Sequence, residues 1–343
     1  MRAPYRVGLL GLGHVGGALA RRLIEDGERV ASAAGRPIIL DAIAVARPEG
    51  RTAPASLVPA DALLKRPHLD AIVELIGGID PALTYICSAL QAGLEVITAN
   101  KQLIAARGPA LAQLGPLRFE ASVASAIPIV ETLAETLAAD RINSLMGILN
   151  GTTNSILDAM AAGADYADAL ADAQRRGLAE ADPSADVDAH DPAAKLAILG
   201  MLGFRRRIEP SQIERVGIRG LDQRHLVAAR ERGFVVKLIA AASMTSPGIE
   251  ADVRPRLIPD DAPLARVAGA MNAISVDAAY AGTLVLQGPG AGPDAAASAV
   301  LADLIRAARG TPASAGALLA SLADQPVATI TPLGLQTPFP AVP

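Results

Sequence analysis

Aromatic residues and cysteine are scarce in this chain. Of its 343 residues only 2% are aromatic, tryptophan is absent, and Cys87 is the single cysteine. One cysteine excludes an internal disulfide and a zinc site built from several thiolates, and it fits a reducing compartment. Because 51% of the residues are hydrophobic, a sizeable core is still possible, but it must be built mainly from Ala, Leu, Val and Ile.

Long apolar runs and an excess of positive charge are also missing. The formal net charge is -4, which provides no basic field for nucleic acid, so we expect no nucleic-acid partner. No segment approaches the roughly 18 uninterrupted apolar residues of a membrane helix. The first strand begins near residue 5 and leaves no room for a signal peptide. We therefore expect a cytoplasmic protein with no membrane partner.

Lysine is the third scarce residue type. Of 31 basic residues only four are lysines, namely Lys65, Lys101, Lys195 and Lys237. Arginine supplies charge equally well, but it does not supply a compact ammonium whose pKa is readily adjusted. A lysine retained in so arginine-rich a chain therefore indicates a specific chemical need, and two of the four fall in the motifs described below.

The order of the expected elements predicts an α/β fold with two domains. Apolar strands are expected at about 5–10, 38–46, 70–76, 94–98 and 117–122, with helices between the later ones, which indicates a Rossmann-type doubly wound parallel sheet. After Pro128 the pattern becomes α+β. We expect a dinucleotide-binding domain at 1–128, completed by about 287–310, a second domain at 129–286, and an irregular proline-rich tail at 325–343.

A glycine motif follows the first strand and opens the first helix. Gly11, Gly13 and Gly16 form the pattern GxGxxG, which allows a tight turn and brings the backbone close to a pyrophosphate at the helix N-terminus. The alternative is an ordinary glycine-rich turn. Arg47 follows the second strand, where an acidic residue would hold the ribose of NAD. The arginine favours NADP, with NAD still possible, unless it is only a solvated loop charge.

Polar motifs end several of the expected strands. ELIGG (74–78) and TANKQLIA (98–105) each close a parallel strand, and in such sheets ligands collect at the carboxyl ends of the strands. Lys101 begins the following helix, where the helix dipole disfavours a cation unless an anionic ligand or a proton-transfer role offsets that cost. We therefore expect Lys101 to belong to a functional site.

The most acidic stretch of the chain lies near its middle. GILNGTTN (147–154) is followed by GLAEADPSADVDAHDPAAK (177–195), which holds five carboxylates and closes with Lys195. Asp191 could simply cap a helix and pair with Lys195 one turn later. The remaining carboxylates repel one another unless something cationic enters, so the stretch is typical of a site for a small zwitterion.

Together these motifs closely resemble homoserine dehydrogenase, from about residue 5 to about residue 305. The resemblance implies reversible hydride transfer between NADP(H) and the C4 carbon of L-aspartate 4-semialdehyde or L-homoserine, a step of threonine and methionine biosynthesis. It also implies a homodimer formed through the sheet of the second domain. Because the chain ends soon after the return helix, we expect a short form without the C-terminal regulatory domain of longer members.

The resemblance assigns roles to individual residues. Lys101 and Lys195 would flank the reacting C4 oxygen as catalytic groups, without indication of which is the acid. The amino-acid substrate would be bound by Glu180, Asp186, Asp191, Asn150, Gly151 and Thr152. The cofactor would be bound by Gly11, Leu12, Gly13, His14, Val15, Gly16, Arg47, Gly77, Thr98, Ala99, Asn100, Lys101 and Gly292.

One loop departs from the family pattern. After Ser122 the family usually reads Val-Gly-Gly-Gly-Ile-Pro, whereas this chain has VASAIP at 123–128, and Ala189 likewise replaces a glycine. Losing these glycines should remove access to positive φ. In the family this loop lends backbone carbonyls to a monovalent cation such as Na⁺, which here would be those of Glu120, Val123, Ser125 and Ile127. The open alternatives are a related NADP-dependent reductase of another small amino or oxo acid, and a non-catalytic NADP-binding regulatory protein.

Overall fold

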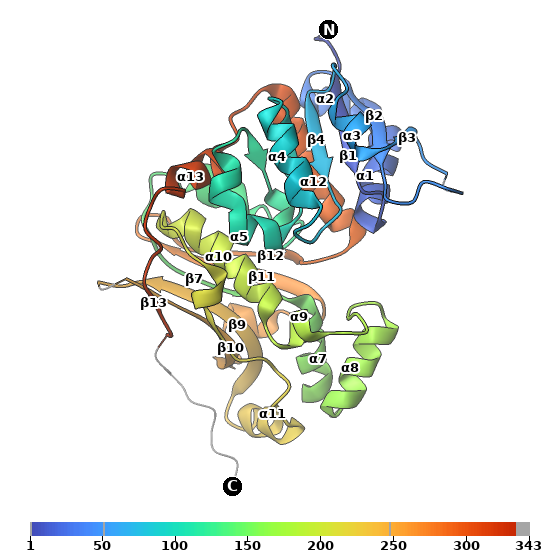
Figure 1. Cartoon of the computed structure of the whole chain (residues 1–343). Coiled ribbons are helices and arrows are strands. Elements are labelled where there is room, and N and C mark those ends of the chain that lie inside the picture. The colour runs from blue at the N-terminus through green and yellow to red at the C-terminus, as the bar shows by residue number, and fades with distance from the viewer. Residues whose placement is uncertain (1, 51, 247, 334–343) are drawn as a thin grey trace. The chain divides into compact units, whose positions relative to one another are not determined.

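The computed structural model describes residues 2–50, 52–246 and 248–333, and it divides the chain into two compact units (Figure 1). Unit 1 comprises Met1–Thr136 and Gly292–Gln325, and unit 2 comprises Leu137–Ala291 and Pro326–Pro343. Both boundaries lie a few residues later than the sequence suggested. The return segment of unit 1 also extends past 310, because a second helix follows the expected one.

Unit 1 is built around a six-stranded parallel sheet with the order β3-β2-β1-β4-β5-β6. The crossovers run to both sides of β1, which creates a topological switch point between β1 and β4, where ligands bind in open α/β sheets. The strands are β1 (Tyr5–Leu10), β2 (Ile38–Ala44), β3 (Ser56–Val58), β4 (Ala71–Glu74), β5 (Glu95–Thr98) and β6 (Leu117–Arg118). This sheet confirms the predicted Rossmann-type fold class.

Helices cover the sheet of unit 1, and the return segment completes its core (Figure 1). Val300 and Leu304 of the return helix are buried in one apolar cluster with Leu9 of β1 and Leu19 of the first helix. The helices are α1 (His14–Glu25), α2 (Gly27–Ala34), α3 (Ala60–Leu64), α4 (Ala82–Gln91), α5 (Lys101–Ala112), α6 (Ile129–Glu131), α12 (Pro293–Arg309) and α13 (Ser314–Leu322), with a 3-10 turn at Glu120–Ser122 and a π-helical turn at Thr132–Thr136.

Unit 2 contains a mixed sheet with the order β12-β11-β7-β9-β10-β13, and β8 also pairs with β10. Its strands are β7 (Ile142–Ile148), β8 (Glu214–Arg215), β9 (Phe234–Met244), β10 (Ile249–Pro259), β11 (Met271–Ala278), β12 (Gly282–Pro289) and β13 (Ile330–Thr331). Its helices are α7 (Gly151–Ala161), α8 (Tyr166–Arg175), α9 (Ser184–Val187), α10 (His190–Phe204) and α11 (Gln223–Arg230). Helix α10 is apolar over most of its surface because it packs on β7 and β9.

The prediction of an irregular tail from 325 onward is wrong in part. Ile330 and Thr331 form β13, which pairs in parallel with the beginning of β10. This pairing satisfies backbone hydrogen-bonding groups at the edge of the sheet, and the stabilisation that results cannot be read from the proline content of the segment. The rest of the predicted tail, residues 334–343, lies outside the described residues.

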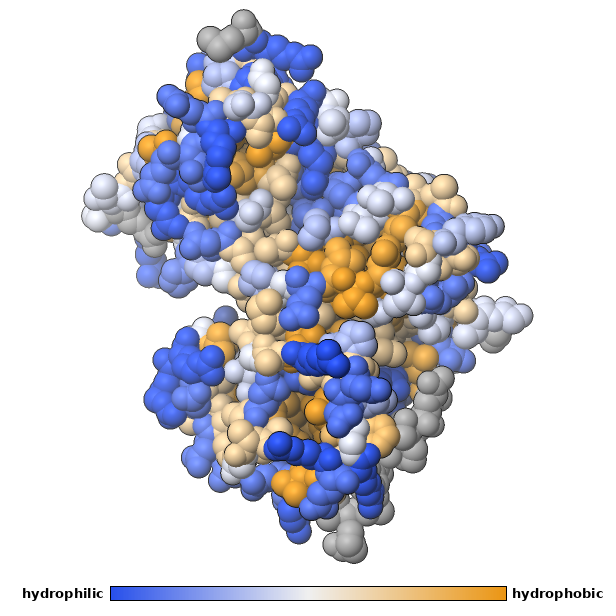
Figure 2. All heavy atoms as spheres, turned by 180° about the vertical axis from the view of Figure 1, so that it is seen from behind, coloured by the Kyte–Doolittle hydropathy of each residue, from blue (hydrophilic) through white to orange (hydrophobic). Residues whose placement is uncertain are grey.

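The surface combines polar residues with patches of apolar ones, as the face drawn in Figure 2 shows. On the sheet of unit 2, Met146 of β7 and Val285 of β12 are exposed by 38% and 45%. In the part of the chain that the structure describes, no helix has the length and apolar character to span a bilayer.

Candidate active site

The glycine motif forms the tight turn that the sequence predicts. Gly11 has a φ of 98°, and a Cβ atom built there would lie 2.7 Å from the carbonyl oxygen of Leu75. A Cβ on Gly16 would lie 2.2 Å from the carbonyl oxygen of Gly11, so neither position accepts a side chain. Gly13 has open space around it and precedes α1, whose first residue is His14. The N-terminus of α1 is thus accessible to an anion such as a pyrophosphate.

A pocket of about 500 Å³ adjoins this turn at the carboxyl ends of β1, β2 and β4. Ala46 lines the pocket, and Arg47 follows it as an exposed residue. Asp41, the nearest earlier carboxylate, accepts hydrogen bonds from Arg6 and Arg66 within the sheet region. Arg47 is therefore placed beside the pocket, whereas the carboxylate of Asp41 is engaged within the protein.

The ELIGG and TANK motifs form one hydrogen-bond network. The buried carboxylate of Glu74 accepts the N–H groups of Ile76 at 2.7 Å and Gly77 at 3.0 Å, and it accepts the hydroxyl of Thr98 at 2.6 Å. The Thr98 hydroxyl oxygen in turn accepts the N–H of Asn100 at 3.0 Å. Glu74, which sequence reasoning left without a role, thus ties the ends of β4 and β5 together.

Asn100 places Lys101 at the start of α5. Its side-chain oxygen accepts the N–H of Leu103 at 3.1 Å, and its amide donates to the carbonyl of Gly78 at 2.5 Å. Lys101 is then the first residue of α5, half-buried, and follows Ala99 and Asn100. The side chains of Thr98 and Asn100 therefore hold the turn between β5 and α5, and this turn places Lys101 at the first position of α5.

Four residues of unit 2 form a compact group, which we call the Lys195 cluster: Asn150, Asp191 and Lys195, which are buried, and Asp186, which is half-buried. Asn150 donates its amide to Asp186 at 2.6 Å and to Asp191 at 2.9 Å. Lys195 lies 2.8 Å from the same Asp191 oxygen and donates to the carbonyl of Leu149 at 2.7 Å. Asp191 and Lys195 are only 7% and 6% exposed. The cluster is centred on the junction between β7 and α7.

The NGTTN motif (150–154) holds the backbone beside the cluster in place. Asn150 caps α7 by accepting the N–H of Thr153 at 2.9 Å. Gly151 follows it, and a Cβ there would lie 2.4 Å from the carbonyl oxygen of Ala270. Thr152 donates its hydroxyl to the carbonyl of Leu178 at 2.7 Å, which links α7 to the acidic stretch. The NGTTN motif therefore fixes the backbone that positions the Asn150 side chain.

The expected mutual repulsion within the acidic stretch does not hold. Asp188 pairs with Arg219 at 2.6 Å, and Asp182 accepts the N–H of Ser184 at 3.1 Å. Arg219 lies far from these carboxylates in the sequence, and nothing in the local pattern signals it. Glu180 is exposed, and its backbone carbonyl accepts the side-chain amide of Gln174 at 3.0 Å.

Three of the four positions at which the family pattern has glycine keep a left-handed backbone. Ala124, Ser125 and Ala189 have φ values of 52°, 47° and 64°. The expectation that losing glycine removes access to positive φ is therefore wrong, because the surrounding structure imposes the conformation on residues with a Cβ. Such a conformation costs about 1–2 kcal/mol per residue.

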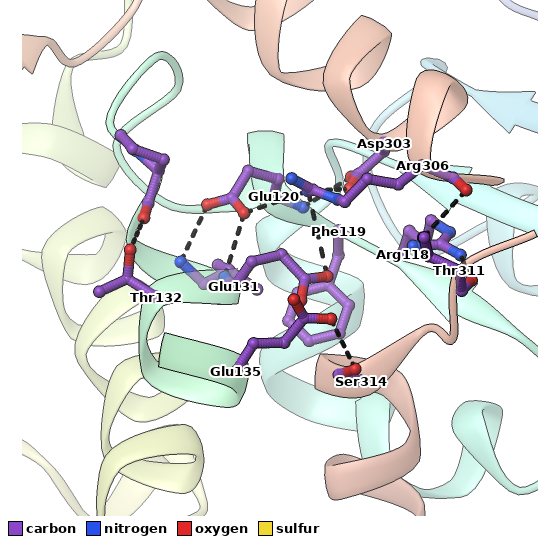
Figure 3. Close-up of polar contacts among 12 residues, drawn as sticks. Arg118, Phe119, Glu120, Glu131, Thr132, Glu135, Asp303, Arg306, Thr311 and Ser314 are labelled. Carbon is purple, nitrogen blue, oxygen red and sulfur yellow. Dashed lines mark hydrogen bonds and ion pairs between the residues drawn. The ribbon is translucent and has the colours of Figure 1, made fainter. Parts of the chain in front are cut away.

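The loop at 123–128 is held by a second buried group, the Glu120 cluster, which comprises Glu120, Glu131, Asp303 and Arg306 (Figure 3). The Glu120 carboxylate accepts the N–H groups of Val130 at 2.9 Å and Glu131 at 3.1 Å. Asp303 accepts the Glu120 N–H at 2.9 Å and bonds Arg306 at 2.5 Å. These contacts join the two ends of the loop through Glu120, and Asp303 and Arg306 bond Glu120 to α12.

Three carboxylates share one guanidinium in the Glu120 cluster. Burial, with the charge of Asp303, raises the pKa of Glu120 to about 7. Burial likewise raises the pKa of Glu131 to about 7 and raises the pKa of Asp303. Desolvation of a carboxylate favours its neutral form, and one Arg306 does not compensate for three such groups.

Comparison with known proteins tests the family assignment. Residues 128–305 match the family described as homoserine dehydrogenase, and residues 11–116 match the family described as homoserine dehydrogenase, NAD binding domain. The homoserine dehydrogenase of Corynebacterium glutamicum is 44% identical over 318 residues, which are 88% of this chain and 72% of that protein. The chain belongs to the homoserine dehydrogenase family.

Solved structures of family members agree with this assignment. The homoserine dehydrogenase of Thiobacillus denitrificans has a TM-score of 0.89 at 37% identity, covering 96% of this chain and 80% of that one. A hyperthermophilic archaeal homoserine dehydrogenase, solved in complex with NADPH, has a TM-score of 0.72 at 25% identity, covering 90% and 99%. This chain is accordingly an NAD(P)-dependent oxidoreductase of the CH–OH group, with an NAD(P)-binding domain in its N-terminal part.

Proposed function

We propose that the chain interconverts L-homoserine and L-aspartate 4-semialdehyde, with NADP(H) as the hydride carrier, and that the Lys195 cluster binds and serves the amino-acid substrate. The observation that carries this proposal is the position of the cluster, a buried amide, two carboxylates and an ammonium, at the β7–α7 junction. No packing requirement explains why so many polar groups meet at one strand end.

The charge balance of the cluster suits a substrate that carries an ammonium group. Asp186 and Asp191 place two carboxylates beside the Lys195 ammonium, so an incoming ammonium group would meet two acidic acceptors at this position. A buried charge is costly unless it is paired and hydrogen-bonded. The α-ammonium of homoserine is such a group, with Glu180 available at the exposed edge of the same stretch.

In this proposal Lys101 and Lys195 interact with the oxygen on the reacting C4 carbon. The nicotinamide, when bound, supplies or accepts the hydride. Lys101 and Lys195 stabilise the developing alkoxide and exchange its proton, directly or through water, and either can be the acid. A compact ammonium suits this role because its proton affinity is readily adjusted by its surroundings.

The glycine turn and its pocket fit a dinucleotide. Gly11 and Gly16 are closed to side chains, while Gly13 leaves the N-terminus of α1 open to a pyrophosphate. Leu12, His14 and Val15 contribute the remaining backbone of this turn, and Gly292 precedes α12 with a φ of 117°.

The direct test is cofactor turnover with the two substrates. NADPH should be oxidised by aspartate 4-semialdehyde, and NADP⁺ should be reduced by homoserine. Turnover with another small oxo acid, but not with the semialdehyde, would favour a related reductase. Tight NADPH binding without oxidation by either substrate would favour a regulatory binding protein.

We further propose a preference for NADP that depends on Arg47. A guanidinium binds the additional phosphate through charge-assisted hydrogen bonds worth roughly 1.5–3 kcal/mol. Arg47→Asp should weaken NADP by about ten- to a hundredfold, following that energy, and leave NAD unharmed or improved. An unchanged ratio of the two cofactor affinities would reject the role of Arg47.

We also propose a monovalent cation at the 123–128 loop. The carbonyl of Glu120 accepts the N–H of Val123, and that of Ile127 accepts the N–H of Ile129. Each carbonyl oxygen has a second lone pair, so these oxygens, with those of Val123 and Ser125, suit a cation. Turnover in sodium chloride should exceed turnover in choline chloride of equal ionic strength, and equal values would reject the site.

We also propose that the protein forms a homodimer through the sheet of unit 2. Met146 and Val285 expose apolar surface on two strands of this sheet, and such surface favours association when it is contiguous. Met146→Glu should shift the protein toward the monomer in analytical ultracentrifugation. A dimer of undiminished stability in this variant would place the interface elsewhere.

A further inference from the structure

Lys237 is a buried lysine that the proposed mechanism does not use. It lies on β9, and the residue is only 3% exposed. Its ammonium donates to the side-chain oxygen of Asn154 at 2.8 Å, to the carboxylate of Asp158 at 2.7 Å and to the carbonyl of Val267 at 2.7 Å. All three N–H donors of the ammonium are therefore matched by acceptors that come from two other parts of unit 2.

The partners of Lys237 also hold the backbone that follows Val267. Asn154 donates its amide to the carbonyls of Val267 at 3.0 Å and Gly269 at 2.8 Å. Asp158 accepts the N–H of Gly269 at 2.6 Å. Asn154 and Asp158 lie four residues apart, on one face of α7. Together with Lys237 they fasten residues 267–270, which we call the 267–270 segment, to that helix.

The 267–270 segment touches the site at Gly151. A Cβ on Gly151 would lie 2.4 Å from the carbonyl oxygen of Ala270 and 2.9 Å from its carbonyl carbon. The backbone of Gly151 therefore rests directly on that of Ala270. On the other side of the same junction, Lys195 donates to the carbonyl of Leu149, and Asn150 donates to the two aspartates.

We propose that Lys237 is a positioning residue for the substrate site. By holding the 267–270 segment against Gly151, it fixes the Leu149 carbonyl and the Asn150 amide, to which Lys195 and the two aspartates are bonded. Without it, the segment loses the bond at the Val267 carbonyl, and Asn154 and Asp158, which hold the rest of the segment, lose the ammonium that orients them. The junction then gains freedom to shift. This inference rests on the proposed function, because it assumes that the Lys195 cluster serves the substrate.

The geometry explains why this position holds lysine in an arginine-rich chain. Three acceptors surround the Lys237 nitrogen, and they come from a side-chain amide, a carboxylate and a backbone carbonyl. An ammonium has three donors arranged around one small atom, whereas a guanidinium presents its donors in one plane. An arginine at this buried position would need more room and would not address all three acceptors.

The test uses Lys237→Met and Asp158→Ala in the full-length protein. Each should lower kcat for homoserine oxidation about tenfold or more, since a shift of roughly 1 Å in a positioned group costs on the order of a hundredfold. The KM for NADP should stay unchanged, because the glycine turn belongs to unit 1. Asp158→Ala carries the test if Lys237→Met does not fold, since the Asp158 side chain is 34% exposed.

The control is Ile249→Ala, which removes buried apolar volume at the opposite end of β10 from the residue that pairs with Lys237. It should lower Tm without changing kcat or either KM. Near-normal homoserine kinetics in folded Lys237→Met or Asp158→Ala would overturn the proposal, as would a loss no larger than that of Ile249→Ala at equal Tm.

Lys195→Arg, assayed alongside, separates this proposal from the one on which it rests. Near-normal turnover in Lys195→Arg would reject the role of Lys195 and with it the reason for positioning that lysine. Loss of turnover in Lys195→Arg, together with normal kinetics in Asp158→Ala, would overturn only the positioning role of Lys237.

Discussion

The Glu120 cluster of unit 1 and the Lys195 cluster of unit 2 are both largely buried groups in which carboxylates outnumber cations, yet their partners differ. In the Glu120 cluster the carboxylates mainly accept backbone N–H groups and share one guanidinium. In the Lys195 cluster they accept from a side-chain amide and a lysine ammonium. Backbone donors cannot leave without unfolding a turn, whereas side-chain donors can reorient when a ligand arrives.

The locations of the two clusters match this difference. The Glu120 cluster joins α12 to the segment between β6 and α6, so its bonds hold together parts of unit 1 that are distant in sequence (Figure 3). The Lys195 cluster lies where β7 ends and α7 begins. We therefore propose that the first cluster holds parts of the fold together whereas the second serves chemistry, and the following experiments test that distinction.

The largest expected effect is on turnover. Lys195→Arg and Lys101→Arg retain the positive charge but lose the compact ammonium, so each should lower kcat for homoserine at least about a hundredfold, the scale of positioned acid–base catalysis. The KM for NADP should change little. Lys65→Arg, at the exposed end of α3, is the control and should have normal kinetics. Near-normal turnover in both active-site variants would refute the chemical role of the lysines.

A smaller effect is expected on substrate affinity. Asp186→Asn removes one negative charge that the substrate ammonium would face, a charged hydrogen bond worth about 1.5–3 kcal/mol. The KM for homoserine should therefore rise by roughly ten- to a hundredfold, the ratio that this energy represents. Glu131→Gln, the matched change in the Glu120 cluster, should leave this KM unaltered. Equal effects of the two variants would erase the distinction between the clusters.

The carboxylates of the Glu120 cluster should instead affect how the free energy of unfolding depends on pH. The pKa of Glu131 is raised by burial from 4.5 to about 7 in the folded protein. The folded state thus binds this proton more tightly than the unfolded state, so the contribution to stability is full below about pH 4.5 and is lost as the pH rises through about 7. Glu131→Gln imitates the protonated form, and it should raise the free energy of unfolding by about 1–3 kcal/mol at pH 8.

Urea denaturation at pH 8 and at pH 5 provides this measurement. The gain from Glu131→Gln should be much smaller at pH 5, where the wild-type carboxyl is largely protonated. A gain of equal size at both pH values would mean that packing, and not charge, distinguishes the variant. A loss of stability at pH 8 would mean that the contact of Glu131 with Arg306 outweighs the cost of burial.

How far the sequence predicts each cluster depends on the distance between its members. Asn150, Asp191 and Lys195 fall in two nearby motifs, and helical spacing already suggested the Asp191–Lys195 pair, which the structure contains. Asp303 and Glu120 are 183 residues apart, and no local pattern brings them together. The Arg219 partner of Asp188 was missed for the same reason.

The sequence identified positions with an unusual backbone but led to the wrong conformation for them. The departures from glycine at Ala124, Ser125 and Ala189 were visible in the sequence, yet the conclusion that they abolish positive φ was incorrect. A sequence shows which residue is present but not how strongly its surroundings constrain it. Here the anchors on either side of each residue over-determine the backbone.

The smallest effect is expected when glycine is restored at Ala124 of the loop in unit 1 and at Ala189 before α10 in unit 2. These two changes test whether the two regions store comparable backbone strain. Ala124 and Ala189 both have left-handed backbones, at φ values of 52° and 64°. Glycine relieves a strain of about 1–2 kcal/mol but loses more backbone entropy on folding, by roughly 0.5–1 kcal/mol. Ala124→Gly and Ala189→Gly should therefore each stabilise the protein by about 0.5–1 kcal/mol, which corresponds to a rise in Tm of a few degrees at most.

Ala193→Gly, within the regular part of α10, is the control and should lower Tm, because no positive φ is relieved there. A fall in Tm for Ala189→Gly similar to that of Ala193→Gly would show that the cap of α10 carries no strain, and that the two regions differ in this respect too.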